Sequence, residues 1–155
     1  MRRNDRAVED FSGQLDILKQ CKILRLAMQD DQGLYLVPLN FGYTLADEVL
    51  HFYIHSAQEG RKVAAMTPGC PVAFELDCQF QLQTADHPCK YSCCYASLIG
   101  TGHAAPVTDP AEKALGLSAI MRQQTGRDFT FTEAQTQAVA VFRIDVEQMT
   151  GKQKQ

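Results

Sequence analysis

Residues 49–62 read Val-Leu-His-Phe-Tyr-Ile-His-Ser-Ala-Gln-Glu-Gly-Arg-Lys, and this stretch decides how the whole chain is interpreted. Its first six residues are apolar except for His51 and are typical of a strand. The octet 55–62 that follows is a polar turn of small residues, and it ends in two adjacent cations that open a short helix. The start of a helix presents free N–H groups and a partial positive charge, so it favours a bound phosphate.

The octet contains three side chains suited to phosphate. Ser56 offers a hydroxyl donor, Arg61 a planar fork of N–H groups, and Lys62 a mobile positive charge. We therefore interpret the octet as the phosphate pocket of a bound cofactor. Taken alone, such an octet is more often an ordinary turn whose cations face water. His55 is by chemistry alone most often a partly buried, satisfied histidine, but its place beside the turn favours contact with a ligand.

Alternation of apolar and polar residues predicts the strands around this octet. We expect six strands, at residues 22–28, 34–41, 49–54, 72–78, 91–107 and 139–146. A turn at residues 30–33 joins the first two as a hairpin. Pro38 cannot donate to a ladder, and Asn40 points to the same side. A flat ligand against this strand would meet peptide groups near Pro38, Leu39 and Asn40 that the sheet does not use; the alternative is a plain edge strand protected by its proline.

Helices are predicted at residues 6–20, from the octet to Met66, and after Asp109. The last of these has an acidic cap, a proline at its first position and Gly126 at its end. Residues 79–90 show little pattern and are expected to form a loop. Because no βαβ rhythm repeats, the predicted fold is mainly β: a six-stranded antiparallel barrel with a few flanking helices, in one domain over residues 1–155.

Composition excludes several classes of function. The net charge of −3 argues against a dedicated nucleic-acid binder, and no apolar run approaches the roughly 20 residues that span a bilayer. Without a signal-peptide pattern we expect a cytoplasmic protein, whose six cysteines are thiols and not a disulfide framework. Cys89, Cys93 and Cys94 lack the paired spacing of closed zinc sites. We predict no metal site, while a redox or metal role of these three cysteines stays open.

Taken together, these motifs resemble a known family. The chain is similar to the nitroimidazole-resistance (Nim-type) branch of the pyridoxamine-5′-phosphate-oxidase-like, FMN-binding split-barrel proteins. The matching segments are residues 1–3, 5–6, 25–28, 33–43, 52–57, 60–62, 95–102, 112–113 and 150–152. Each segment is weakly specific, but their order and spacing over most of the chain make the match specific.

The resemblance implies a homodimeric split barrel that holds FMN in a groove between subunits. The flavin phosphate would be bound by His55, Ser56, Arg61 and Lys62. The flavin ring would lie along Pro38, Leu39 and Asn40, and Ser97 stands in the place of another flavin contact. The oxidase branch of the family usually carries an Arg and a Lys on the second strand. Residues 37–43 contain neither, which argues against oxidation of pyridoxamine phosphate.

The implied activity is that of a nitroreductase-like, FMN-dependent oxidoreductase. NADH or NADPH would reduce FMN, and the reduced flavin would pass electrons to a small acceptor such as a 5-nitroimidazole, another nitroaromatic or a quinone. His55 is the one candidate for direct catalytic help, as a proton source or substrate contact. The alternative is a non-catalytic flavin- or haem-binding module, a carrier or a sensor, and a dimeric scaffold is a third possibility.

Overall fold

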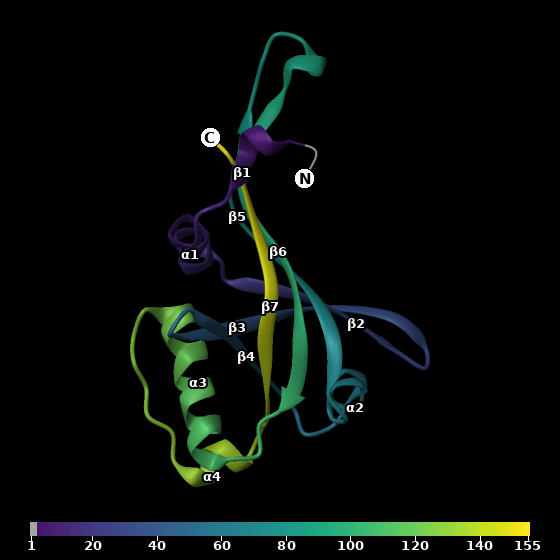
Figure 1. The fold of residues 1–155 in the computed structure, drawn as a ribbon, viewed down its shortest axis with the longest axis vertical. Coiled ribbons are helices and arrows are strands. Elements are labelled where there is room, and N and C mark those ends of the chain that lie inside the picture. Colours follow the sequence, from purple (N-terminus) through teal and green to yellow (C-terminus); the bar gives the residue numbers. More distant parts are fainter. Residues whose placement is uncertain (1–2) are drawn as a thin grey trace.

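A computed structural model describes residues 3–155, so the first two residues of the N-terminal motif 1–3 lie outside the described part. Its strands form one antiparallel sheet that curls into a barrel (Figure 1). The helical elements are η1 (Asn4–Arg6), α1 (Phe11–Gln20), α2 (Arg61–Met66), η2 (Pro88–Lys90), α3 (Pro110–Thr125) and α4 (Glu133–Gln137). The strands are β1 (Ala7–Val8), β2 (Ile23–Asp30), β3 (Gly33–Ala46), β4 (Val49–Ser56), β5 (Cys70–Gln83), β6 (Ser92–Pro106) and β7 (Ala140–Lys154).

The barrel closes through strands that are distant in sequence. The strand order is β1-β7-β4-β3-β2-β5-β6, and a further pairing between β6 and β7 completes the ring. The six predicted strands are the ones in this ring. The predicted count of six is wrong, because β1 pairs with the far end of β7, at Lys152 and Gly151. This seventh strand occupies residues that were expected to begin a helix, and α1 starts only at Phe11, after the cap at Asp10.

The interior of the barrel is filled by the alternating apolar side chains of its strands. Phe41, Phe52 and Phe74 are fully or almost fully buried and meet edge to face, with ring centroids 5.5 and 5.0 Å apart. The end of α1 adds Ile17 and Leu18 to this core. Helix α1 therefore covers one part of the barrel wall and belongs to the same packing unit as the strands.

Helix α3 lies across the outer surface of β3 and β4. It has the predicted ends: Asp109 accepts the Glu112 N–H, Pro110 stands at the start, and Gly126 ends it at φ 74°. Its apolar side packs with Tyr53 in a second buried cluster. Contact is closest at Gly42, where an added Cβ would lie 2.1 Å from the Ala119 carbonyl carbon.

β3, β5 and β7 extend at least five residues beyond their predicted ends. β5 continues to Gln83 and pairs with β6, so the predicted loop 79–90 is wrong over its first five residues. The two strands leave the barrel as an arm, seen at the top of Figure 1, on which Phe80 is 73% exposed and Leu82 is also exposed. β7 continues past the predicted end at residue 146 as far as Lys154 because β6 pairs with it along the whole length. None of the helices within residues 3–155 is long and apolar enough to cross a membrane.

Candidate functional site

One edge of β3 is open over the first part of the strand. β3 pairs with β2 from Gly33 to Asn40, but its pairing with β4 begins only at Phe41, opposite Ile54. β4 meanwhile continues to Ser56 and pairs with β7. Among the strands of residues 3–155, none pairs with this edge of β3 before Phe41. The peptide groups along the edge are therefore available to a ligand.

The side chains on this strand divide between the two faces of the sheet. Pro38 and Asn40 are exposed and point outward together, as predicted, while Leu39 between them is buried in the core. Leu39 can therefore meet a ligand through its backbone only. Across the opening, His55 is exposed and Ser56 is buried at the end of β4. The two strand segments that the sequence singled out thus flank one corner.

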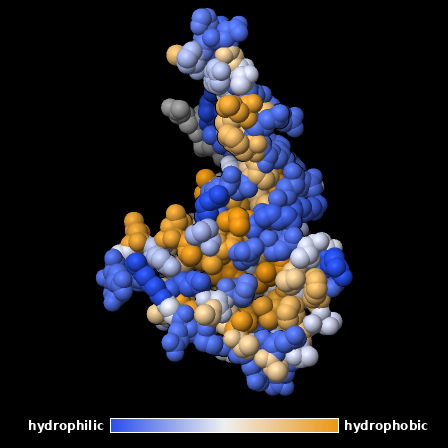
Figure 2. Space-filling view, turned by 180° about the vertical axis from the view of Figure 1, so that it is seen from behind, coloured by the Kyte–Doolittle hydropathy of each residue, from blue (hydrophilic) through white to orange (hydrophobic). Residues whose placement is uncertain are grey.

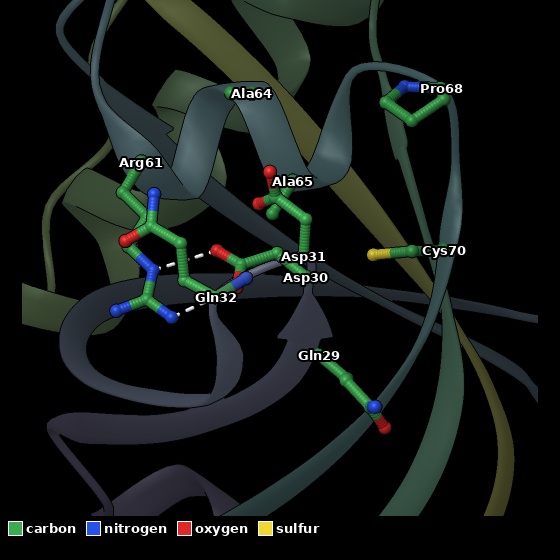
Figure 3. Close-up of a pocket in the computed structure, with 9 residues that line it drawn as sticks. All are labelled: Gln29, Asp30, Asp31, Gln32, Arg61, Ala64, Ala65, Pro68 and Cys70. Atoms are coloured by element: carbon green, nitrogen blue, oxygen red, sulfur yellow. Dashed lines mark hydrogen bonds and ion pairs between the residues drawn. The ribbon is translucent and has the colours of Figure 1, made fainter.

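The next element, α2, begins at this corner with Gly60 as its N-cap residue. The two cations that follow have different surroundings. Arg61 donates from Nε to Asp30 Oδ2 at 2.7 Å and from Nη2 to Asp30 Oδ1 at 2.9 Å, and its guanidinium lies 4.5 Å from the Tyr35 ring centroid. Figure 3 shows this pair between α2 and the β2–β3 turn. The hydrogen bond from Arg61 lowers the pKa of Asp30, so the pair is charged at neutral pH.

Lys62 differs from Arg61 because it has no carboxylate partner within residues 3–155. Its side chain is half-buried at the first turn of α2. Helix α2 has only six residues, so its macrodipole is a minor source of attraction for an anion. Within residues 3–155, the positive charge at this corner that has no carboxylate partner is therefore that of Lys62, while Nη1 of Arg61 is not bound by Asp30.

The partner of Arg61 was missed by sequence reasoning, which used Asp30 only as part of a turn signal. Behind the ion pair lies a cavity of about 390 Å³, lined by both carboxylates of the turn and by residues of α2 (Figure 3). Asp30 lies 31 positions before Arg61, and the two meet because the β2–β3 turn folds back beside α2. Only the register of the sheet brings them together.

Ser97 does not lie at the corner formed by β3, the end of β4 and the start of α2. It lies on β6, opposite Asp77 of β5 and Lys152 of β7. In the strand order, β2 and β5 separate β6 from β3. At about 4.8 Å between neighbouring strands, Ser97 is too far from the open edge of β3 to contact the same ligand group within one chain.

A second polar group lies under the start of α3. The Glu112 carboxylate accepts from Tyr53 Oη at 3.2 Å and from Arg143 Nη1 at 2.8 Å. Arg143 also pairs with Asp145, whose Oδ1 lies 2.7 Å from His51 Nδ1. Burial raises the pKa of Tyr53, and the neighbouring Glu112 raises it further. No local pattern around His51 points to Asp145; the pairing of β4 with β7 places the two residues opposite each other.

The cysteines form no cluster suited to a metal in the described part of the chain, where no group of three or more His, Cys, Asp or Glu side chains is placed to hold an ion. All six cysteines are free thiols. Cys89 is exposed on the arm, while Cys93 and Cys94 are half-buried on β6. Because neighbouring residues of a strand point to opposite faces, Cys93 and Cys94 do not act as a pair.

Comparisons with known proteins agree with this architecture. The family model described as pyridoxamine 5′-phosphate oxidase matches residues 14–153. A candidate 5-nitroimidazole antibiotic resistance protein from Bacteroides thetaiotaomicron is 30% identical, with a TM-score of 0.78 over 94% of this chain and 85% of that one. No curated protein sequence matches the chain.

Two more distant structures share the fold. The FAD and heme binding protein of Mycobacterium smegmatis is 17% identical, with a TM-score of 0.79 over 97% of this chain and 74% of that one. A FAD-binding protein of Mesorhizobium loti is 20% identical, with a TM-score of 0.65 over 94% of this chain and 96% of that one. The chain therefore belongs to the pyridoxamine 5′-phosphate oxidase-like family of split-barrel proteins and fits its Nim-type branch.

Proposed function

We propose that this chain binds FMN at the corner between β3, β4 and α2 and uses it to pass electrons from a nicotinamide cofactor to a small acceptor. The observation that carries the proposal is the open edge of β3, together with Lys62 of α2, which has no carboxylate partner within residues 3–155. Flavin binding is also in keeping with the flavin-binding neighbours that share this fold. When bound, the flavin supplies the hydride and electron chemistry, and the protein supplies binding and orientation.

The residues at the corner fit a flat ligand with a doubly charged tail. Lys62 can pair with a phosphate, and Ser56, at the end of β4, carries a hydroxyl donor. The backbone near Pro38 and Asn40 offers polar groups to the edge of a heteroaromatic ring. His55 is exposed at the same corner, where its imidazole can hold a proton for the acceptor or contact it directly.

The proposed role of Arg61 in phosphate binding is limited by its pairing with Asp30. Two of its donor groups are bound by Asp30, so it can bind a phosphate either through Nη1 or by leaving Asp30. A phosphate dianion competes with a carboxylate for the same planar fork. We infer that Asp30 keeps Arg61 oriented when no anion is bound. When a phosphate is bound, Asp30 competes with it and weakens the contribution of Arg61 to phosphate binding.

A second copy of the chain would complete the site. Leu34 and Leu36 on β3 are 86% and 63% exposed. Leu36 lies opposite Ala27 of β2, which in turn lies opposite Ala73 of β5, so small side chains follow it across the sheet. Figure 2 shows such hydrophobic surface across the middle of the molecule. This apolar face suits a homodimer, in which Ser97 of one copy would contact the flavin of the other.

The visible absorption spectrum of the purified protein tests cofactor binding. Flavin bands support the proposal, while a Soret band or a colourless protein that does not take up FMN contradicts it. The double variant Arg61→Ala/Lys62→Ala should weaken FMN binding by about tenfold or more and leave the fold intact. The control is Lys90→Ala, which removes an exposed cation from the arm and should leave FMN affinity unchanged.

Electron transfer is tested separately under anaerobic conditions. NADH or NADPH should bleach the flavin, and a 5-nitroimidazole or a quinone should restore its colour. His55→Ala should slow the reoxidation step more than it weakens FMN binding. A flavin that no nicotinamide cofactor reduces would leave a carrier or sensor as the function. For the dimer, Leu36→Glu should give a monomer in sedimentation that retains FMN poorly, whereas an unchanged dimer would exclude this face.

A further inference from the structure

Two cysteine side chains meet where α1 ends. Cys21 is the C-cap residue of α1 and is fully buried, and Cys78 is half-buried on β5. Both thiols donate to the same acceptor, the Ile17 carbonyl oxygen, from 3.4 Å for Cys21 Sγ and 3.9 Å for Cys78 Sγ. Figure 1 shows α1 beside the strands that carry the arm.

The hydrogen bonding of this pair allows both thiol protons to leave. The Ile17 carbonyl also accepts the Cys21 backbone N–H at 3.3 Å, as in an ordinary last turn of a helix. A carbonyl oxygen has two lone pairs, so three donors at Ile17 are more than it needs. Loss of both S–H groups would therefore leave no buried acceptor without a partner.

We propose that Cys21 and Cys78 are an oxidation site that forms a reversible disulfide, with a hydroperoxide as the oxidant. Cys78 is the more accessible thiol, so its sulfur takes an oxygen atom from hydrogen peroxide to give a sulfenic acid and one water molecule. The Cys21 sulfur then attacks the Cys78 sulfur, the S–S bond forms, and the hydroxyl group leaves with the Cys21 proton as a second water molecule. Two thiols are thereby oxidised by two electrons, and a dithiol reductant reverses the reaction.

The environment makes this reaction slow. Burial raises the pKa of the Cys78 thiol, and burial also raises that of Cys21, which lies beside Cys78. The negative charges of Asp77 and Glu75 also raise the pKa of Cys21. Because the thiolate is the reacting form, the rate should rise by about tenfold per pH unit between pH 6 and 8. The pair therefore suits a crosslink that builds up under lasting oxidation.

The disulfide would connect α1 to β5 at the base of the arm. β5 is irregular at this point, because the pairing with β6 shifts between Cys78 and Gln81 and Gln79 has a φ of 62°. Such a shift gives the strand room to adjust its backbone to the geometry of a disulfide. The crosslink closes a long loop through β2, β3 and β4, so it should raise Tm by about 5–10 °C.

The test treats the full-length protein with excess hydrogen peroxide, blocks the remaining thiols and maps the peptides without reduction. We expect a linked Cys21–Cys78 peptide, its release by dithiothreitol, and a higher Tm of the oxidised protein. The variants Cys21→Ala and Cys78→Ser should each lack both the linked peptide and the redox-dependent change in Tm. Cys78 is half-buried, so at least its variant should fold normally.

The matched control is Cys70→Ser, because Cys70 lies on the same strand and burial alone raises its pKa. This variant should form the disulfide as the wild type does. The proposal is overturned if Cys21 and Cys78 both stay free thiols after the exposed Cys89 has been fully oxidised. It is also overturned if Cys78 pairs with another cysteine, or if oxidation shifts the Tm of the Cys78→Ser variant as much as that of the wild type.

Discussion

Replacing Gly42 with alanine tests the contact that places α3 on the barrel. The added Cβ would lie 2.1 Å from the carbonyl carbon of Ala119 and 2.2 Å from the backbone nitrogen of Ile120. Both are backbone atoms, which no side-chain rotamer can move away. Helix α3 must therefore shift outward by about 1 Å, and the cluster formed by Tyr53 and Leu117 loosens with it.

We expect Gly42→Ala to lower the free energy of unfolding by about 3 kcal/mol, at the upper end of the usual cost of overpacking. For a chain of this length, that corresponds to a fall in Tm of roughly 5–10 °C, measured by circular dichroism. The same shift displaces Gln124, whose Nε2 donates to the Phe41 carbonyl at 3.2 Å. Because Phe41 is the residue at which β3 parts from β4, FMN affinity should fall several-fold as well.

The control is the double variant Gly42→Ala/Ala119→Gly. The clash is with backbone atoms, so removing the Ala119 methyl group should restore neither stability nor FMN binding. If the double variant recovers the wild-type Tm, the contact is with a side chain and the packing described above is wrong. If Gly42→Ala alone melts within about 2 °C of the wild type, α3 does not lie against β3 at this position.

Three further predictions concern polar groups. Asp30→Asn frees Arg61 and removes a negative charge, so FMN should bind about tenfold more tightly in flavin fluorescence titrations at low salt. Weaker binding of FMN would show instead that Asp30 positions the Arg61 guanidinium. The two N–H groups of Gln123 Nε2 are shared among three carbonyl oxygens at the end of α1, so Gln123→Ala should cost about 2–3 kcal/mol in urea unfolding. Burial raises the pKa of Asp145, but the Arg143 guanidinium and His51 together lower it by more, so its pKa is lower in the folded state than in the unfolded chain. Asp145→Asn should therefore destabilise the protein at pH 7, and the difference from the wild type should disappear as the pH falls below about 4.

Local sequence patterns predicted most of the elements. The alternation of residues 72–78 gave β5, and the cap at Asp109 with the stop at Gly126 gave the ends of α3. Where the prediction failed, partners remote in sequence decided the structure. β1 has only two residues, too few for any periodicity, and exists because the end of β7 pairs with it. Helix α4 was not among the predicted helices, although the capping box of Thr132 and Gln135 is a local signal for its start.

In the candidate site, too, local features were predicted from the sequence and contacts between distant residues were not. The octet 55–62 was correctly expected to join a strand to a short helix, and Pro38 and Asn40 do lie beside an unpaired edge. The surroundings of Arg61 were not foreseen, because an arginine in a turn gives no indication of which carboxylate will face it. The position of Ser97, across the sheet from the corner, was equally hidden, since it depends on the order of the strands.

The sequence by itself determined the existence of the six barrel strands, the ends of α3 and the family, because alternation, caps and turn residues act over a few neighbouring positions. The tertiary structure decided where β3 loses its partner, which charge Arg61 faces, and which two of six thiols meet. These properties depend on strand order and register, through which residues 21 and 78, or 30 and 61, become neighbours. Such pairings arise from packing of the whole barrel and leave no mark in any short stretch of the chain.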